Sequence, residues 1–436
     1  MSDETKTFKV DMLARVEGEG RFSLTVRDGE VIDARLAIFE APRFFEAFLR
    51  GRTIDEVPDI VARICGICPI AYQMSAVAAL EAAAGHVAPR PIVDLRRLMY
   101  CGEWIESHTL HVFMLHAPDF LGYPSAVEMA ADHREIVERG LRLKKTGNAI
   151  IELLGGRAIH PVSVVVGGFS RTPTVRELRK LREDLARGLE EAEATVWWAA
   201  SLPTPDFEQD YVFVALRGDR YPLESGDALA VTGRDPIPLE EFDAAFVETH
   251  VEHSNALQCR LRDGTPYLTG PMARLAHFAE QLHPRAAAAL EATGLPLPIR
   301  NPFQSIVVRA VEIVHAFAEA LDLVDAYVAI DPPRAMLEAR DGGGVGCTEA
   351  PRGICWHRYE TSAEGTIVSA RIVPPTSQNQ ARIEQDLVGI APELLDATHE
   401  AATHRCEQLI RAYDPCISCA THFLRLDIER LPTESS

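Results

Sequence analysis

Long apolar runs are missing from this chain of 436 residues. A membrane-spanning helix needs about 20 consecutive, mostly apolar residues, and no stretch comes near that length. The first residues, MSDETKTFKVDML, also lack the positive charge followed by an apolar stretch that marks a secretory signal. We therefore expect no membrane span and a cytoplasmic location, unless a partner subunit supplies an export signal.

Positive charge is scarce as well. The chain has 44 lysines and arginines against 64 aspartates and glutamates, so its formal net charge is −20. Proteins that bind nucleic acid need a positive surface to replace the counterions of the phosphate backbone. The charge balance therefore excludes nucleic acid as an expected partner.

Cysteine is sparse and odd in number, with nine residues in the chain. A disulfide framework is not expected from such a count, and metal-binding or redox cysteines in a reducing compartment fit better. Four of the nine form two C-x-x-C pairs. The other five show no such spacing and are interpreted as buried, inert thiols; they are Cys101, Cys259, Cys347, Cys355 and Cys406.

Local patterns predict both strands and helices. FSLTV and VIDARLAIF around RDGE predict a β-hairpin. FFEAFLRG predicts a short helix that ends at Gly51, and the spacing of Thr53 and Glu56 predicts a capping box at the start of the next helix. PIAYQMSAVAALEAAAG predicts a helix that begins at Pro69 and ends before Gly85.

Apolar residues at helical spacing dominate the rest of the chain. More proline, glycine and β-branched residues at 205–270 and 325–380 predict strands and loops, with a glycine-rich loop at 341–346. Long helices are predicted at about 91–116, 126–154, 174–200, 273–293, 304–323 and 381–412. The fold class is therefore α+β and mainly α, with a central bundle of long helices, a small N-terminal antiparallel sheet and mixed β and loop insertions.

The two C-x-x-C pairs lie near opposite ends of the chain, in RICGICPI at 63–70 and YDPCISCATH at 413–422. Cys65 and Cys68 directly precede a predicted helix, whose N-terminus favours thiolates. Together with Cys416 and Cys419 they offer four soft ligands for zinc, copper(I), nickel or iron. A structural zinc site is one interpretation, but zinc ribbons bring their pairs together over roughly 15–20 residues, and here roughly 350 residues intervene.

Five motifs resemble the large, catalytic subunit of the nickel–iron hydrogenases. They are ARVEGEG (14–20), RICGIC (63–68) with SHTLH (107–111), GGRAIHP…GG (155–168), GCTEAPRG (346–353) and DPCISCATH (414–422). The residues in these motifs are most similar to those of the cytoplasmic, NAD(P)-linked branch, also called sulfhydrogenases. The resemblance implies one large-subunit domain over residues 1–422.

The resemblance implies a bimetallic centre that cleaves H2 reversibly and heterolytically. Nickel would be held by all four thiolates, and iron, carrying carbon monoxide and cyanide, would share two of them. By position, Cys65 and Cys416 would be terminal on nickel, while Cys68 and Cys419 would bridge to iron. Cys416 would also be the first base for the proton.

Other residues match family positions around this centre. Glu17 matches a proton-gate glutamate, although EGEG alone would suggest a solvated turn. Arg352, with Pro351 and Asp414 beside it, matches the canopy over the open metal position. A lone arginine would otherwise suggest a surface salt bridge, and Asp-Pro a simple helix end.

A magnesium site is also implied by the resemblance. Glu46, the carbonyl of Arg371 and His422 match its protein ligands, although a glutamate in FFEAFLRG would otherwise be interpreted as a helix-surface acid. Oxygen ligands with retained water suit magnesium.

Three positions depart from the family pattern. Tyr72 stands where many members have histidine, which puts a proton-relay role there in doubt. Ser107 stands where the canopy of the standard enzymes has an aspartate, so one acid is missing. Near the iron ligands, VPPTSQN places Pro374 and Thr376 at the site, with Pro375 where a hydroxyl is common. Either Thr376 substitutes for that hydroxyl or the hydrogen bond is absent.

Partners follow from the same resemblance. Because the remaining cysteines form no cluster by spacing, an iron–sulfur small subunit is expected to dock through a large, largely apolar interface and pass electrons to diaphorase and flavin subunits. The tail 423–436 is expected to be removed by a maturation endopeptidase. Alternatives are a non-catalytic scaffold with structural zinc, a subunit like the quinone-site subunit of complex I, or, within the family, another acceptor such as a heterodisulfide reductase partner.

Overall fold

The computed structural model describes residues 5–27, 30–39, 44–338 and 340–421. Within these ranges, no helix has the length and apolar character needed to cross a membrane. Helices outnumber strands, and every sheet is small and antiparallel, which confirms the α+β, mainly α fold class.

The described helices fall into three groups. Those of eight or more residues are α3 (Pro69–Ala84), α4 (Arg90–Thr109), α7 (Arg134–Gly155), α9 (Arg182–Ala200), α11 (Pro271–Phe278), α12 (Pro284–Glu291), α13 (Ser305–Ala326), α14 (Pro375–Leu394) and α15 (His399–Ala412). Shorter ones are α1 (Phe45–Leu49), α2 (Val57–Val61), α5 (Ala117–Leu121), α6 (Ala126–Asp132), α8 (Val175–Arg179), α10 (Phe242–Ala245) and α16 (Ile417–Ala420). The tighter or wider turns are η1 (Ala62–Ile64), η2 (Leu110–His116), η3 (Leu239–Glu241), η4 (Ala279–Gln281) and η5 (Pro302–Gln304).

The described strands form five sheets. They are β1 (Thr5–Val10), β2 (Gly20–Arg27) and β3 (Glu30–Ile38); β4 (Val164–Val165) and β5 (Gly168–Phe169); β6 (Val214–Arg217), β7 (Ala228–Val231) and β8 (Ile237–Pro238); β9 (Phe246–His250) and β10 (Leu257–Leu261); and β11 (Gly342–Ala350), β12 (Gly353–Thr361) and β13 (Ile367–Val373).

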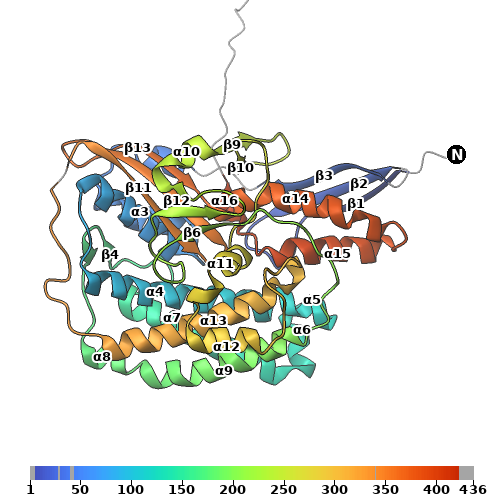
Figure 1. Ribbon diagram of the computed structural model, residues 1–436, viewed down its shortest axis with the longest axis horizontal. Coiled ribbons are helices and arrows are strands. Elements are labelled where there is room, and N and C mark those ends of the chain that lie inside the picture. The colour runs from blue at the N-terminus through green and yellow to red at the C-terminus, as the bar shows by residue number, and fades with distance from the viewer. Residues whose placement is uncertain (1–4, 28–29, 40–43, 339, 422–436) are drawn as a thin grey trace, which may run out of the picture.

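The elements form two main layers (Figure 1). Long helices α4, α7, α9 and α13 pack on one another in the lower half of the view, while α3 and the sheet β11–β13 lie above them. The N-terminal sheet lies at one side against α14 and α15. One large apolar core runs through the helices, and a second cluster surrounds Trp356 under β6, β7 and β12.

Several local predictions are confirmed. The hairpin strands β2 and β3 pair antiparallel, and β1 adds a third strand that the sequence patterns did not predict. Helix α3 has Pro69 in its first turn and ends at Gly85, whose φ is 66°. Helix α1 is followed by Gly51, whose φ is 76°. The helix predicted at 304–323 is α13.

Of the other long helix predictions, one was right about continuity and four were wrong. The segment 91–116 is unbroken, but its last part widens into the π-helical turn η2. Breaks divide 126–154 into α6 and α7, 174–200 into α8 and α9, and 273–293 into α11, η4 and α12. The last of these breaks precedes Pro284, which cannot continue a helix. The segment 381–412 is α14 and α15, and Thr398 caps the second of them through its side chain.

Two further predictions were wrong. Glu56 accepts hydrogen bonds from the backbone and hydroxyl of Thr53, but helix α2 begins only at Val57, so this is a turn and not a capping box. The glycine-rich segment is part of strand β11. A Cβ atom at Gly344 would lie 2.1 Å from the carbonyl oxygen of Ala79 on α3. The glycines therefore serve close packing of a strand on a helix.

Candidate metal centre

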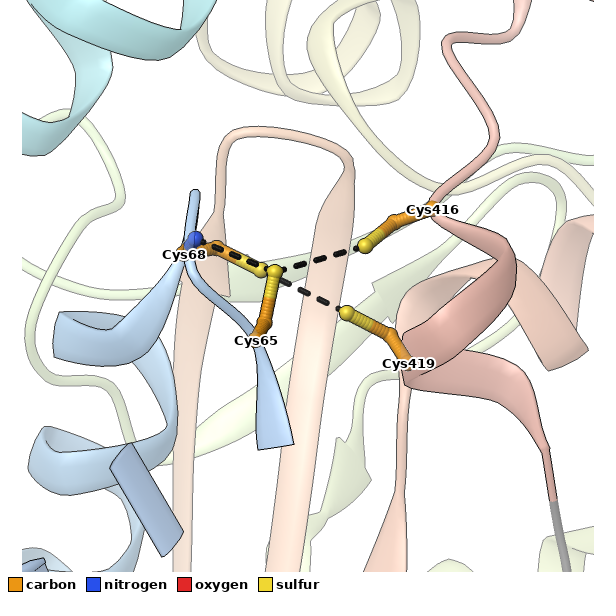
Figure 2. A group of neighbouring side chains, drawn as sticks. All are labelled: Cys65, Cys68, Cys416 and Cys419. Carbon is orange, nitrogen blue, oxygen red and sulfur yellow. Dashed lines mark hydrogen bonds between the residues drawn. The ribbon is translucent and has the colours of Figure 1, made fainter. Parts of the chain in front are cut away.

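The four paired cysteines meet in one buried cluster, although about 350 residues separate the pairs. Their sulfur atoms all lie within 4.8 Å of one another. Cys65 Sγ is 3.5 Å from Cys416 Sγ, and Cys68 Sγ is 3.6 Å from Cys419 Sγ. Figure 2 shows the two pairs approaching from opposite sides, one from the turn before α3 and one from α16. The predicted convergence of the two pairs is confirmed.

The first pair is supported by helix α3. Cys68 is its N-cap residue, and the sulfur of Cys65 accepts hydrogen bonds from the backbone amides of Ile67 and Cys68, each at 3.3 Å. Glu103 of α4, which is fully buried, accepts from the first-turn amides of Ile70 at 2.7 Å and Ala71 at 3.2 Å. Burial raises the pKa of Glu103, against the two amide hydrogen bonds.

The second pair is supported by residues distant in sequence. The backbone of Glu17 pairs with that of Cys416, and its carboxylate accepts from Cys416 Sγ at 3.1 Å and from the amide of Ser418 at 3.0 Å. The hydroxyl of Thr376 accepts from the amide of Cys416 at 3.0 Å. Sequence predictions for Glu17, Thr376 and Cys416 therefore name residues that lie together.

The four thiols influence one another's pKa values. Hydrogen bonds from Cys416, Cys419 and Cys68 lower the pKa of Cys65 well below its usual value. Burial first of all raises the pKa values of Cys416 and Cys419. Burial therefore opposes ionisation of the C-terminal pair, and a bound soft metal ion is the species that would stabilise thiolates here.

A buried arginine lies close enough to the cluster for the thiolates to act on its charge. Arg352 Nε donates to the carbonyl of Asp414 at 2.7 Å, and Nη2 donates to its carboxylate at 3.2 Å. Burial opposes the charge of Arg352, but Asp414 and the thiolates outweigh it and raise the pKa of the guanidinium. Arg352 Nη1 and Asp414 Oδ2 are buried and have no hydrogen-bond partner among the described residues. This canopy pair therefore keeps spare polar atoms beside the cluster.

The remaining predicted residues occupy different surroundings. Pro351 precedes Arg352 in the turn between β11 and β12. Pro374 lines a cavity of about 210 Å³ with Cys419. The side chains of Ser107 and Tyr72 are buried, and their hydroxyls lack partners among the described residues.

The residues predicted to bind magnesium are partly described. Glu46 lines the same cavity, and its carboxylate accepts from the amide of Ile372 at 2.7 Å, so it lies at the Arg371–Ile372 peptide. The side chain of Arg371 turns instead to Asp243 and Glu248. His422 lies outside the described residues.

Several buried charged residues near the site were not predicted. Arg274 bridges Glu312 and Glu349, and all three side chains are fully buried. Glu103 was also missed. Charged residues inside strongly apolar helical segments, as in SIVVRAVEIVHAF, could have indicated them. A charged residue that is buried in such a segment almost always has a paired partner.

The five other cysteines are free and buried, as predicted, and burial raises the pKa of Cys406 to about 12. Among the described residues, the only His/Cys/Asp/Glu cluster suited to a metal ion is the four-cysteine one. Its adjacent carboxylate and guanidinium are not needed by a closed zinc site, so the donor set fits a reactive metal centre.

Comparison with known proteins agrees with this geometry. A family model described as nickel-dependent hydrogenase matches residues 43–139 and 303–422. The chain is 36% identical to the alpha subunit of sulfhydrogenase 1 of Pyrococcus furiosus, covering 96% of this chain and 98% of that protein. It is 32% identical to an F420-non-reducing hydrogenase (vhu) of Methanocaldococcus jannaschii, covering 86% of this chain and 96% of that protein.

Solved structures show the same fold. An NAD+-reducing [NiFe]-hydrogenase in the H2-reduced state superposes with a TM-score of 0.86 at 29% identity, covering 96% of this chain and 99% of that chain. The Ni-Fe-Se hydrogenase of D. vulgaris Hildenborough superposes with a TM-score of 0.79 at 23% identity, covering 96% and 100%. With four buried thiols at one site and these relatives over nearly its whole length, the chain belongs to the nickel-dependent hydrogenases, as the catalytic large subunit of a [NiFe] hydrogenase.

Proposed function

We propose that Cys65, Cys68, Cys416 and Cys419 all bind nickel, and that Cys68 and Cys419 also bind an iron ion carrying carbon monoxide and cyanide. The observation that carries the proposal is the 4.8 Å sulfur cluster with a carboxylate 3.1 Å from one of its sulfurs. A nickel–iron centre held by these residues would supply an electron-rich metal with an open position for heterolytic cleavage of H2.

Side chains of this chain form a proton-transfer path away from the centre. The thiolate of Cys416 accepts the proton, and the carboxylate of Glu17 takes it from the sulfur across the existing 3.1 Å hydrogen bond. Glu17 is half-buried, so it connects the closed pocket with the outside. Its second hydrogen bond, from the amide of Ser418, holds the carboxylate in place while the proton moves.

The canopy supplies a fixed positive charge. Asp414 holds the guanidinium of Arg352 through two contacts, and the buried Nη1 remains available for a group bound at the centre. A preoriented charge in a dry site stabilises developing negative charge without reorganisation. Pro374 lines the cavity beside Cys419, and Thr376 holds the amide of Cys416. Pro351 and Ser107 are proposed to line the same site, with the Ser107 hydroxyl in place of an acid.

Electrons leave through a partner. The described residues hold no second metal cluster, so an iron–sulfur small subunit is proposed to dock near the centre. Gly66, between the first two cysteines, is exposed, and Ile159 beside it is 60% exposed, which suits an apolar contact there. Similarity to an NAD+-reducing enzyme supports a diaphorase with flavin as the next acceptor in the cytoplasm; a heterodisulfide reductase partner is the alternative.

A magnesium site and the removal of the C-terminal tail complete the proposal. Glu46 and the carbonyl of Arg371, with His422 beyond the described residues, are proposed to bind magnesium next to the cavity that Cys419 lines. An endopeptidase is proposed to remove 423–436 and leave the domain 1–422. Mass spectrometry of nickel-loaded protein tests this, and an intact tail there contradicts it.

Metal analysis with infrared spectroscopy of the purified holoenzyme tests the function. We expect about one nickel and one iron in this chain and absorption in the cyanide and carbonyl window. One zinc with no such absorption would overturn the proposal in favour of a structural scaffold.

A further inference from the structure

The canopy arginine stands on a tight turn whose backbone is held by other buried side chains. Strands β11 and β12 pair up to Ala350 and Gly353, so Pro351 and Arg352 form the two residues of the turn. Such a turn leaves the carbonyl of Pro351 without a strand partner, and the carbonyls of Glu349 and Ala350 lie at the end of β11 just before it. The donors that hold these carbonyls therefore set the position of the Arg352 backbone.

Three successive carbonyls before Arg352 each accept a hydrogen bond from a buried donor. Trp104 Nε1 donates to the carbonyl of Glu349 at 3.0 Å. Arg274 Nη1 donates to that of Ala350 at 3.1 Å, and Nη2 donates to that of Pro351 at 3.1 Å. Trp104 lies on α4 and Arg274 on α11, so two separate helices hold the turn.

Arg274 itself has almost no freedom to move. It donates to Glu312 at 2.7 and 2.8 Å and to Glu349 at 2.8 Å, and its guanidinium lies 4.2 Å from the ring centre of Trp104. Tyr221 further holds Glu312 at 2.8 Å. Buried ion pairs contribute little stability compared with apolar packing. The main effect of this network is therefore to fix the position of the groups that it binds, including the carbonyls before Arg352.

We propose that Arg274, assisted by Trp104, is a positioning residue for the guanidinium of Arg352. It acts through the backbone of the turn and touches no reacting group. The inference rests on the proposed function, because it assumes that the position of Arg352 matters for H2 turnover.

Arg274→Lys is the principal test. Lysine keeps the charge that Glu312 and Glu349 need, but its three donors cannot replace the five of arginine in a fixed fork. Displacement of a reacting group by about 1 Å can cost about 100-fold in rate. We expect kcat for H2 oxidation by the holoenzyme to fall by about 10- to 100-fold, with KM for H2 nearly unchanged and the infrared bands of the diatomic iron ligands shifted.

The chain offers a matched control in Arg96. It too is buried and donates to a buried carboxylate, that of Glu81, at 2.9 and 2.6 Å, but it shares no partner with Arg274 and holds no part of the turn. Arg96→Lys is therefore expected to lower thermal stability much as Arg274→Lys does, with kcat and infrared bands as in the wild type. Equal kcat and unshifted bands in both variants would show that Arg274 is only structural and overturn the proposal.

A milder variant covers the case in which Arg274→Lys does not fold. Trp104→Phe keeps an aromatic ring under Arg274 but removes the donor to the Glu349 carbonyl and part of the buried indole. A smaller fall in kcat and a smaller shift of the infrared bands are expected. Wild-type values in this variant would then overturn the proposal. Arg352→Lys distinguishes the role of Arg352 in turnover from the positioning role of Arg274. If Arg352→Lys leaves kcat unchanged, Arg352 has no role in H2 turnover. If Arg352→Lys lowers kcat strongly but Arg274→Lys has no effect, only the positioning role of Arg274 is disproved.

Discussion

The two cysteine pairs reach the same cluster by different means. Cys65 and Cys68 stand at the start of α3, a helix of 16 residues whose first-turn amides are held by buried Glu103. Cys416 and Cys419 stand on α16, a helix of only four residues. That second side follows Asp414, which has a positive φ of 51°, and is held by Glu17 and Thr376 from distant parts of the chain.

The difference separates a preformed side from an assembled one. A helix of 16 residues with proline at its first position forms most of its own turn structure, so the first pair depends mainly on local geometry, with Glu103 as one tertiary support. A single short turn is not stable alone, so the second pair depends on tertiary contacts. This arrangement suits a site in which the C-terminal pair closes over a metal that the N-terminal pair already contacts.

Removing one sulfur should have the largest effect, because it breaks the cluster itself. Cys419→Ser replaces a soft ligand with a hydroxyl, and we expect nickel and iron affinity to fall by more than the roughly 100-fold that loss of an outer hydrogen bond causes. Metal analysis measures this. Cys406→Ser, in a buried thiol outside the cluster, is the control, and wild-type metal content in Cys419→Ser would remove its bridging role.

Glu17→Gln should separate two roles of Glu17 on the assembled side: holding the backbone at Ser418 and taking the proton from Cys416. Glutamine still offers an oxygen to the amide of Ser418 but cannot accept the proton of Cys416. We expect metal content to be kept and H/D exchange with H2 to slow by about 10²- to 10⁴-fold. Exchange at the wild-type rate would disprove the gate assignment. Glu19→Gln, two residues away and exposed, is the control.

Glu103→Ala probes the preformed side. The change leaves two buried amides of α3 without acceptors, at about 1–3 kcal/mol each, so a clear drop in thermal midpoint is expected. Glu177→Ala, which removes a half-buried glutamate that accepts from the N-cap residue Thr174 of its own helix α8, should cost much less. Equal shifts in the two variants would show that Glu103 does not support the Cys68 turn.

Thr376→Val should have the smallest effect of this series, on the assembled side. Valine has a similar shape but cannot accept from the amide of Cys416, so nickel affinity should fall by about tenfold, as for other hydrogen bonds that hold a metal ligand from behind. Thr376→Ser keeps the acceptor and should bind nickel normally. If valine and serine behave alike in nickel titrations, the hydroxyl does not hold Cys416 in place.

The fold was predictable where its cause was local. Helix α3 follows from Pro69 and Gly85, and the hairpin strands β2 and β3 follow from alternation around a turn. Continuity failed at 273–293 and 381–412, because apolar periodicity persists across a break that one capping residue or proline creates. Strand β11 was missed because glycine in a loop and glycine packed on a helix look the same in sequence.

The candidate site was predictable to a similar degree. Glu17, Arg352, Asp414 and Thr376 were named from motifs and lie around the cluster. Glu103, Arg274 and Trp104 were not named, since each acts through a backbone group of a segment far away in the chain. Nothing in a local pattern records which carbonyl or amide a buried side chain will meet.

The sequence by itself determined the ligand chemistry, because two C-x-x-C pairs offer soft sulfur ligands whatever the fold does with them. It also determined the helix on which the first pair stands. The tertiary structure alone decided that sulfurs about 350 residues apart lie within 4.8 Å, and that a carboxylate and a guanidinium lie beside them. The physical reason is that hydrogen-bond spacing along a chain is local, whereas distances between remote segments are set by packing of the whole core.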